Sequence, residues 1–420
     1  MTRPWNTHLL RTALTGCLCL LLSACASTPA ADARPSNAAR SYAFWPLFPA
    51  DPRIQFLRSF GSSDDLAPRK ASGLESIVFG KEVTQEAMIN KPYGLTMKGG
   101  KIYVCDMRAG SLVVLDLLKK QTRLVGVAGS GRLTHPVAVA IADDGMIYVA
   151  ESDRGAIIVF DARERYSYSM GFQKFKPVSL ALHGDRLYAC DMAGQVVQIF
   201  DRKSGSHLGS IGSVGDEDGQ FRLPLGVATD AEGNVYAVDM MRGRVQKFSP
   251  DGRFIAGVGT IGDTPGTFAR PKHIAVDADG IVYVVDAAFQ NVQMFDDQLR
   301  LLMAFGAAGD FPGSMNLPAG ICVVEDGAQL FADALHPGFA ATRLVAVTNQ
   351  FGSAKVSVYA LGQAREGYTA ADLAKSAAKV SPGTGATPDT LQLQELGQEP
   401  EPTPAPAPEV QPTAPPVSPK

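Results

Sequence analysis

The chain has 420 residues and a formal net charge of −3, and hydrophobic residues make up 45% of it. A chain of this length and composition can bury a substantial core, which is typical of an ordered protein rather than a disordered one. The near-neutral charge provides no global basic field of the kind that favours nucleic-acid binding. We therefore expect a folded protein without a nucleic-acid partner.

Residues 1–24 have the pattern of an export signal. A basic start is followed by an apolar run from Ala13 to Leu22, which is too short to cross a bilayer as a helix. The run ends in Leu22-Ser23-Ala24-Cys25, which resembles the lipobox of bacterial lipoproteins. The resemblance implies that Cys25 becomes the acylated first residue of the mature protein, and that Ala26 directs it to the outer membrane.

Two short segments precede the main part of the chain. Residues 25–53 are rich in Ala, Ser and Pro and are predicted to form a flexible tether, in which the stretch from Trp45 to Pro49 is expected to pack on the folded domain. Ile54 to Gly61 has the composition of a strand.

Six related units follow between residues 54 and 361. Each unit opens with a Pro, and the separations between successive prolines are 44, 41, 47, 47 and 47 residues. Short apolar runs alternate with Gly, Asn and Asp turns in every unit, a pattern that predicts antiparallel strands joined by hairpins. The opening prolines are Pro92, Pro136, Pro177, Pro224, Pro271 and Pro318.

A strand-only repeat of this length predicts a β-propeller with one four-stranded sheet in each repeat. The fold class is therefore all-β, a six-bladed propeller over residues 54–361. The strand at Ile54–Gly61 is expected to join the last blade, so that both ends of the chain close the ring. In the sixth unit, the run at 344–348 could be the second strand or the third.

The fourth unit carries a resemblance to a known family. Pro224-x-Gly226, the run from Gly233 to Asp239, and the run from Arg244 to Phe248 together resemble the NHL repeat of six-bladed propellers. This resemblance implies the fold strongly. It implies little about function, because such propellers include binding scaffolds, nucleic-acid binders and lyases.

Residues 362–420 change in character. A short helical pattern near 370–380 gives way to Pro, Glu, Ala and Thr, which predicts a disordered tail.

An acidic residue lies 14 or 15 positions after each opening proline, where a hairpin turns. Because the residue recurs with the repeat, and because Asp at a turn accepts backbone N–H bonds, we interpret the set as structural. The six acids are Asp106, Glu151, Asp191, Asp239, Asp286 and Asp333.

The candidate ligand-binding residues lie where the chain enters each first strand. Most of these positions are basic or imidazole, which favours either an anion-attracting mouth on one face or ordinary solvated loop ends. The candidates are Lys91, His135, Lys176, Arg270, Lys272 and His273.

An enzymatic alternative is a metal-dependent lyase or a lactonase-like propeller with its active site at the channel mouth near His273. Zinc enzymes require three protein ligands and an open position, whereas His273 is the only histidine on the predicted inner ring. We therefore predict no catalytic residues, no metal and no cofactor.

The sequence favours a monomeric, periplasm-facing lipoprotein of the outer membrane. Its expected partners are the membrane, through the lipid anchor, and an envelope protein or an anionic glycan or metabolite.

Overall fold

The computed structural model describes residues 41–66 and 88–378, and the predicted export signal, Cys25 and most of the predicted tail lie outside these residues. The chain divides into two units, Met1–Ser41 and Tyr42–Lys420, and the second contains the fold described below. None of the helices among the described residues is long and apolar enough to span a membrane.

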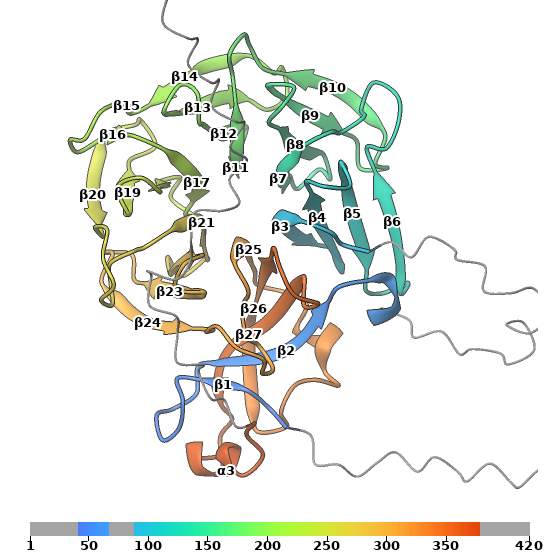
Figure 1. The fold of residues 1–420 in the computed structure, drawn as a ribbon, viewed down its shortest axis with the longest axis vertical. Coiled ribbons are helices and arrows are strands. Elements are labelled where there is room, and N and C mark those ends of the chain that lie inside the picture. Colours follow the sequence, from blue (N-terminus) through green and yellow to red (C-terminus); the bar gives the residue numbers. More distant parts are fainter. Residues whose placement is uncertain (1–40, 67–87, 379–420) are drawn as a thin grey trace, which may run out of the picture. The chain divides into compact units, whose positions relative to one another are not determined.

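The second unit is a six-bladed β-propeller (Figure 1), as the repeat predicts. Each of the first five blades is a four-stranded antiparallel sheet in which the first strand is innermost and the fourth is outermost. Blade one comprises β3 (Pro92–Lys98), β4 (Lys101–Asp106), β5 (Ser111–Asp116) and β6 (Gln121–Val125). Blade two comprises β7 (Pro136–Ile141), β8 (Ile147–Glu151), β9 (Ala156–Phe160) and β10 (Tyr166–Met170).

The next three blades repeat the arrangement. Blade three comprises β11 (Pro177–His183), β12 (Arg186–Asp191), β13 (Val196–Asp201) and β14 (His207–Ile211). Blade four comprises β17 (Pro224–Thr229), β18 (Val235–Asp239), β19 (Arg244–Phe248) and β20 (Phe254–Val258). Blade five comprises β21 (Pro271–Val276), β22 (Val282–Asp286), β23 (Asn291–Phe295) and β24 (Leu301–Phe305). A small parallel pair, β15 (Ser213–Val214) and β16 (Gln220–Phe221), lies in the connection between blades three and four.

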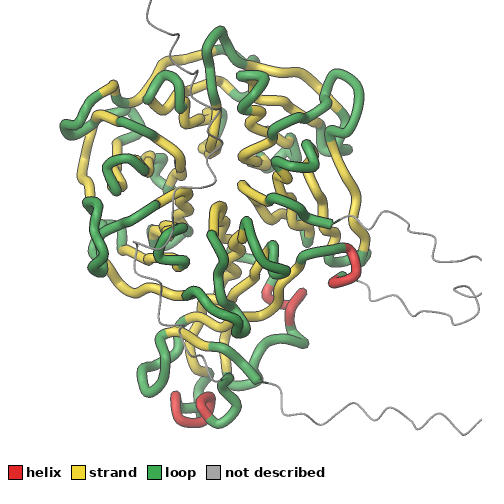
Figure 2. The backbone as a smooth tube through the Cα atoms, viewed as in Figure 1, coloured by secondary structure: helices red, strands yellow, loops and turns green. Residues whose placement is uncertain are grey.

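The second strands explain why the repeat must form a ring. Every residue of β8, β18 and β22 is buried, on both faces of the strand. A single sheet cannot bury both of its faces, so each blade packs between two neighbours. Successive first strands contact one another, and β25 (Pro318–Val324) contacts β3, which closes the circle. Figure 2 shows the ring, with helix restricted to a few short segments.

The sixth blade is completed by chain from both ends, which confirms the expected closure. Its sheet has the order β1-β2-β27-β26-β25, where β1 is Phe44–Trp45, β2 is Ile54–Phe60, β26 is Phe339–Asn349 and β27 is Val356–Ala364. Strand β2 pairs antiparallel with β27, and Ile54 lies opposite Leu361. In Figure 1 the blue β2 lies alongside the orange-red β27. The run at 344–348 therefore belongs to the second strand of this blade.

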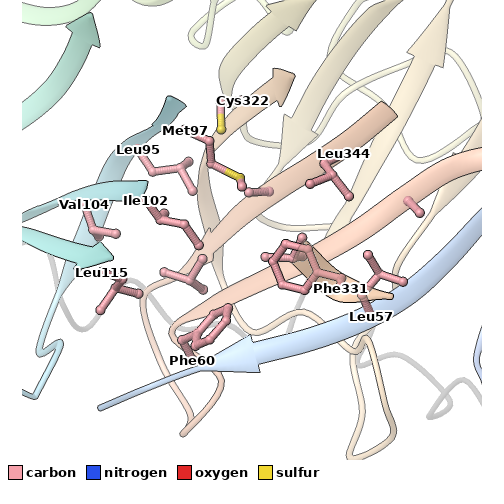
Figure 3. Packing of buried hydrophobic residues seen from close by; sticks show 14 of the residues in the cluster. Leu57, Phe60, Leu95, Met97, Ile102, Val104, Leu115, Cys322, Phe331 and Leu344 are labelled. Carbon is pink, nitrogen blue, oxygen red and sulfur yellow. The ribbon is translucent and has the colours of Figure 1, made fainter. Parts of the chain in front are cut away.

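Closure of the ring buries a cluster of hydrophobic side chains between blades six and one. Figure 3 shows Leu57 and Phe60 from β2 facing the same cluster as Leu95 and Ile102 from blade one. Phe60 is almost fully buried. Full burial of a side chain of this size contributes about 1.5–3 kcal/mol, so β2 stabilises the last blade directly.

One repeat acid is not where the spacing placed it. Asp333 follows the 3-10 helix η2 (Ala328–Phe331) in a long connection before β26, and it forms an exposed ion pair with Arg58 at 2.6 Å. The residue opposite the opening Pro318 is Asn349, at the end of β26. The prediction for Asp333 was wrong because an insertion separates the two strands, and a helical turn within it reproduces the expected spacing.

The predicted limits of the tether and the tail also change. Phe44 and Trp45, placed in the tether at 25–53, are buried against the propeller. On the C-terminal side, the chain assigned to the tail from 362 contains the end of β27 and helix α3 (Ala370–Ala374), whose Leu373 is buried. Tyr42 forms a parallel bridge with Ala377, so the propeller incorporates both segments.

Candidate functional site

One face of the ring carries both the residues that precede each first strand and the turns that follow each second strand. We call it the proline face, because the prolines that open the first strands lie at this end. The register demonstrates this arrangement, since Pro92 lies opposite Asp106 and Pro271 opposite Asp286. The remaining acids opposite their prolines are Glu151, Asp191 and Asp239.

The five carboxylates on this face bind the backbone. Asp106 accepts hydrogen bonds from four backbone N–H groups, two in the approach to β3 and two in its own turn, at 2.6–3.2 Å. Asp239 accepts from the N–H groups of Arg222 and Leu223. Each carboxylate is buried and joins the loop before the first strand to the end of the second. Equivalent bonds are made by Glu151, Asp191 and Asp286.

Asn349 replaces the carboxylate in blade six. Its Oδ1 accepts from the Asn316 N–H at 3.1 Å, so it keeps part of the structural role. Its amide group also donates to the Ala354 carbonyl oxygen and to Ser357 Oγ, which a carboxylate could not do. The ring of negative charge beneath the proline face is therefore interrupted at blade six.

Lys272 occupies this interrupted sector. It lies in the innermost strand of blade five and is 7% exposed. Its Nζ donates to Gln350 Oε1 in blade six at 2.8 Å and lies 5.6 Å from the centroid of the Tyr93 ring in blade one. Because both partners are neutral, burial lowers the pKa of Lys272, and together with the charges of Arg270 and Lys91 it brings the value to about 7.

Other cations gather around Lys272. Arg270 opposes the rise in the Tyr93 pKa, which burial brings to about 12, so its charge reaches the same ring. Lys355, in the turn before β27, donates to the Gln350 carbonyl oxygen at 3.1 Å, and burial lowers its pKa although the Asp106 charge opposes the shift. Within residues 41–66 and 88–378, no ion pair with a carboxylate involves Lys91, Arg270, Lys272 or Lys355. We call these four residues the cationic sector.

His273 points away from this sector. Its Nε2 lies 3.2 Å from Ser179 Oγ in blade three, and Ser179 Oγ also accepts from the Val227 N–H at 3.0 Å. Burial lowers the pKa of His273 to about 4, so the imidazole is neutral at physiological pH. Its Nδ1 is buried with no hydrogen-bond partner in the described structure. Ser179 is fully buried, so this pair links blades rather than meeting a substrate.

The other two predicted ligand residues stand apart. His135 Nδ1 lies 3.7 Å from the Asp153 carboxylate, which lowers its capacity to attract an anion. Lys176 is exposed at the approach to β11 in blade three, across the ring from blade six. The structure thus brings together Lys91, Arg270 and Lys272 and separates His135, Lys176 and His273 from them.

The cationic sector and the neutral groups that contact it include three residues that the sequence analysis did not identify. Tyr93, Gln350 and Lys355 come from the first strand of blade one and from the second turn of blade six, more than 250 residues apart. Only ring closure brings them together. Within the described part of the chain, no group of three His, Cys, Asp or Glu is arranged to hold a metal ion.

Comparison with known proteins supports the fold. No protein-family model matches the chain. A structure of a protein of unknown function from Bacteroides thetaiotaomicron is 17% identical, with a TM-score of 0.50, over 65% of this chain and 70% of that one. Virginiamycin B lyase from Staphylococcus aureus is 11% identical, with a TM-score of 0.45, over 65% of this chain and 96% of the lyase. A calcium-binding protein, regucalcin, from Agrobacterium tumefaciens is 12% identical, with a TM-score of 0.46, over 66% and 92%. The similarity to the Bacteroides protein concerns the fold alone, and the other two are too weak to support a conclusion.

Proposed function

We propose that the propeller is a binding module that takes a small anionic ligand, such as an acidic metabolite or glycan, at the cationic sector of its proline face. The observation that carries this proposal is the gathering of Lys91, Arg270, Lys272 and Lys355 without an ion-paired carboxylate. Like charges held together in a partly buried place repel one another, and an anion relieves that repulsion.

The interruption of the acid ring supports the same site. In the other blades a buried carboxylate lies directly beneath the proline face and offsets nearby cations. In blade six Asn349 is neutral, so the buried carboxylate of the other blades is missing there. Gln350 and Tyr93 supply a polar group and an aromatic wall beside the charges.

A calorimetric titration with small carboxylates and sulfate at low salt tests the proposal. Arg270→Glu and Lys91→Glu are expected to weaken binding at least tenfold, because each reverses a charge in the sector. Lys119→Glu, in the exposed turn after β5 on the opposite face, is the matched control and should leave the affinity unchanged. Equal affinity in all three variants would exclude the cationic sector as the site.

Two other measurements, a pull-down and a metal analysis of the purified protein, could redirect the function. Loss of capture of an envelope protein, rather than of small anions, on reversing Lys176 and Arg270 would favour a protein scaffold. Stoichiometric zinc or calcium that disappears on replacing His273 would favour the metal-dependent lyase or lactonase.

We further propose that the protein is a monomeric lipoprotein, acylated at Cys25 and anchored in the outer membrane facing the periplasm. The Leu22-Ser23-Ala24-Cys25 sequence supports this proposal. Radiolabelled palmitate should be incorporated into the wild-type protein and not into Cys25→Ser, which should leave the membrane fraction. Density-gradient separation of the two membranes tests the destination, and sedimentation of the detergent-free domain tests the oligomeric state.

A further inference from the structure

We propose that Lys272 is a nucleophilic amine that condenses with the carbonyl group of a small 2-oxo carboxylate to form a reversible imine. This inference rests on the proposed anion site and names both the chemistry and the ligand class of that site. Three features carry it: the neutral surroundings of the amine, the cations beside it and its limited exposure.

The surroundings of Lys272 favour a neutral amine. Its Nζ has a single hydrogen-bond partner, the uncharged Gln350 Oε1, and the face of the Tyr93 ring on another side. An ammonium ion that is 93% removed from water with no counter-ion is costly, so the proton is released readily. The low pKa of Lys272, which the neighbouring Arg270 and Lys91 depress further, agrees with this reasoning. Lysines become nucleophiles by this combination of desolvation and an adjacent cation.

The hydrogen bond to Gln350 does not prevent the reaction. A neutral amine donates one N–H to the amide oxygen and retains a lone pair that points elsewhere. That lone pair is available to attack a carbonyl carbon.

The same two cations define the ligand class. Arg270 lies two residues before Lys272 in the chain, and Lys91 lies two residues before Tyr93, whose ring Lys272 faces. A ligand whose carbonyl carbon reaches Lys272 is therefore expected to direct its adjacent carboxylate toward these two cations. Arg270 can hold a carboxylate through two parallel N–H bonds. Since Lys272 is only 7% exposed, the ligand must be small around its carbonyl carbon. A 2-oxo carboxylate such as pyruvate or glyoxylate meets these requirements.

The reaction is balanced without a further reagent. The Lys272 amine attacks the carbonyl carbon, forming a C–N bond, and a proton moves from nitrogen to oxygen to give a carbinolamine. The hydroxyl group then leaves as water with the remaining amine proton, and a C=N bond replaces the C=O bond. No oxidant, reductant or metal takes part, and hydrolysis reverses the step.

Borohydride trapping tests the inference on the purified full chain. We expect pyruvate with cyanoborohydride to add one reduced adduct per chain, which peptide mapping places on Lys272 in the wild-type protein. Lys272→Arg should lose the adduct, whereas Lys119→Arg, which removes an exposed lysine on the opposite face, should retain it. Arg270→Gln should raise the pyruvate concentration for half-maximal trapping by roughly tenfold, since a charge-assisted bond is lost. Acetone, which lacks the carboxylate, should react far less.

The mapping on wild-type protein keeps the test decisive even if Lys272→Arg fails to fold. Adducts distributed over exposed lysines with none on Lys272 would overturn the proposal, as would equal trapping of acetone and pyruvate. Lactate, which has the carboxylate but no carbonyl, separates the two levels of the argument. If lactate and pyruvate bind in calorimetry and no imine is trapped, the covalent step fails while the anion site stands. If neither binds, the anion site itself fails.

Discussion

Asn349 lies opposite Pro318 in the position that Asp286 occupies opposite Pro271. A single amide in place of a carboxylate removes one buried negative charge from the ring of acids. The change falls in the sector that Lys272 of blade five reaches through its hydrogen bond to Gln350. The irregular blade is thus also the blade next to which the cations collect.

Restoring the acid should weaken anion binding. In Asn349→Asp, the new carboxylate lies one residue before Gln350, which both Lys272 and Lys355 contact, and offsets their charges, so we expect a several-fold loss of affinity in calorimetry. The variant should also lose about 1–3 kcal/mol of stability, because the donors to Ala354 and Ser357 disappear. Asp333→Asn, at the exposed ion pair with Arg58, is the control and should bind normally. Unchanged affinity in Asn349→Asp would contradict the electrostatic account.

The buried acids should be stabilising. Asp106→Ala removes the acceptor of four backbone N–H groups, so we expect a loss of about 3 kcal/mol or more in the free energy of unfolding. Asp106→Asn should cost less, because the amide oxygen still accepts. Asp333→Ala should cost no more than about 1 kcal/mol, as is usual for an exposed ion pair. Denaturant titration of the three variants measures their losses of stability. Similar losses for Asp106→Ala and Asp333→Ala would refute the structural role of the buried acid.

The innermost strands of blades six and one leave no room for a side chain at Gly320. A Cβ at Gly320 would lie 2.2 Å from the Tyr93 carbonyl oxygen, whereas one at Gly226 would lie 3.0 Å from its nearest neighbours. We expect Gly320→Ala to cost about 2–4 kcal/mol, since blades six and one would have to move apart, and Gly226→Ala to cost less. Thermal or chemical denaturation gives the ranking. The reverse ranking would show that the strands around Gly320 shift to accommodate a methyl group more easily than those around Gly226.

The stability of the protein should depend on Lys272 above neutral pH. The native pKa is about 7 and the unfolded value is 10.5, so between these values the unfolded state binds the extra proton. The stability of the wild type relative to Lys272→Met should therefore rise from about pH 7 to 10 and should be lowest below pH 7, where the charged amine stays buried. The expected span is about a few kcal/mol, since one pH unit corresponds to about 1.4 kcal/mol. The cations whose charges act on Lys272 are Arg270 and Lys91. A flat difference would mean that Lys272 is protonated in the native state.

His273 should make the stability of the protein depend on pH in the acidic range. Its native pKa is about 4 against 6.5 in the unfolded chain, so the unfolded state takes up the proton first as the pH falls. The wild type should lose stability between pH 6.5 and 4, and His273→Gln should lack that part of the slope. Chemical denaturation at half-unit pH steps measures it. Parallel slopes for the two proteins would place the acid sensitivity elsewhere.

The sequence predicted the six-bladed propeller because each repeat contains the strand and turn pattern of its own blade. The opening prolines are the first residues of all six innermost strands, and the strand at Ile54–Gly61 joins the last blade as the edge argument required. The residue opposite Pro318 in the sixth blade was predicted wrongly because the insertion before β26 contains an acid, Asp333, at the repeat spacing. An acid at the expected interval cannot be recognised as part of an insertion without knowing which residues pair.

The site was less accessible to sequence reasoning. Lys272 and Arg270 were identified from their positions before and inside a first strand. Their contacts with Tyr93 and Gln350 depend on which blades meet when the ring closes. No local pattern encodes a contact between residues so distant in the chain. His135 and His273 were also predicted from their positions before and inside a first strand. In the structure His135 lies beside Asp153 and His273 beside Ser179.

The bridge between Tyr42 and Ala377 has a mechanical consequence. The Tyr42 N–H donates to the Ser376 carbonyl oxygen at 3.0 Å, and the Ala378 N–H donates to the Tyr42 carbonyl oxygen at 2.7 Å. Tension arriving along the chain at residue 41 is therefore resisted first by the C-terminal segment at 376–378, before it reaches the strand that closes the ring. Because these bonds join the N-terminal and C-terminal segments of the propeller, a force applied at residue 41 should break them before it separates β2 from the sixth blade.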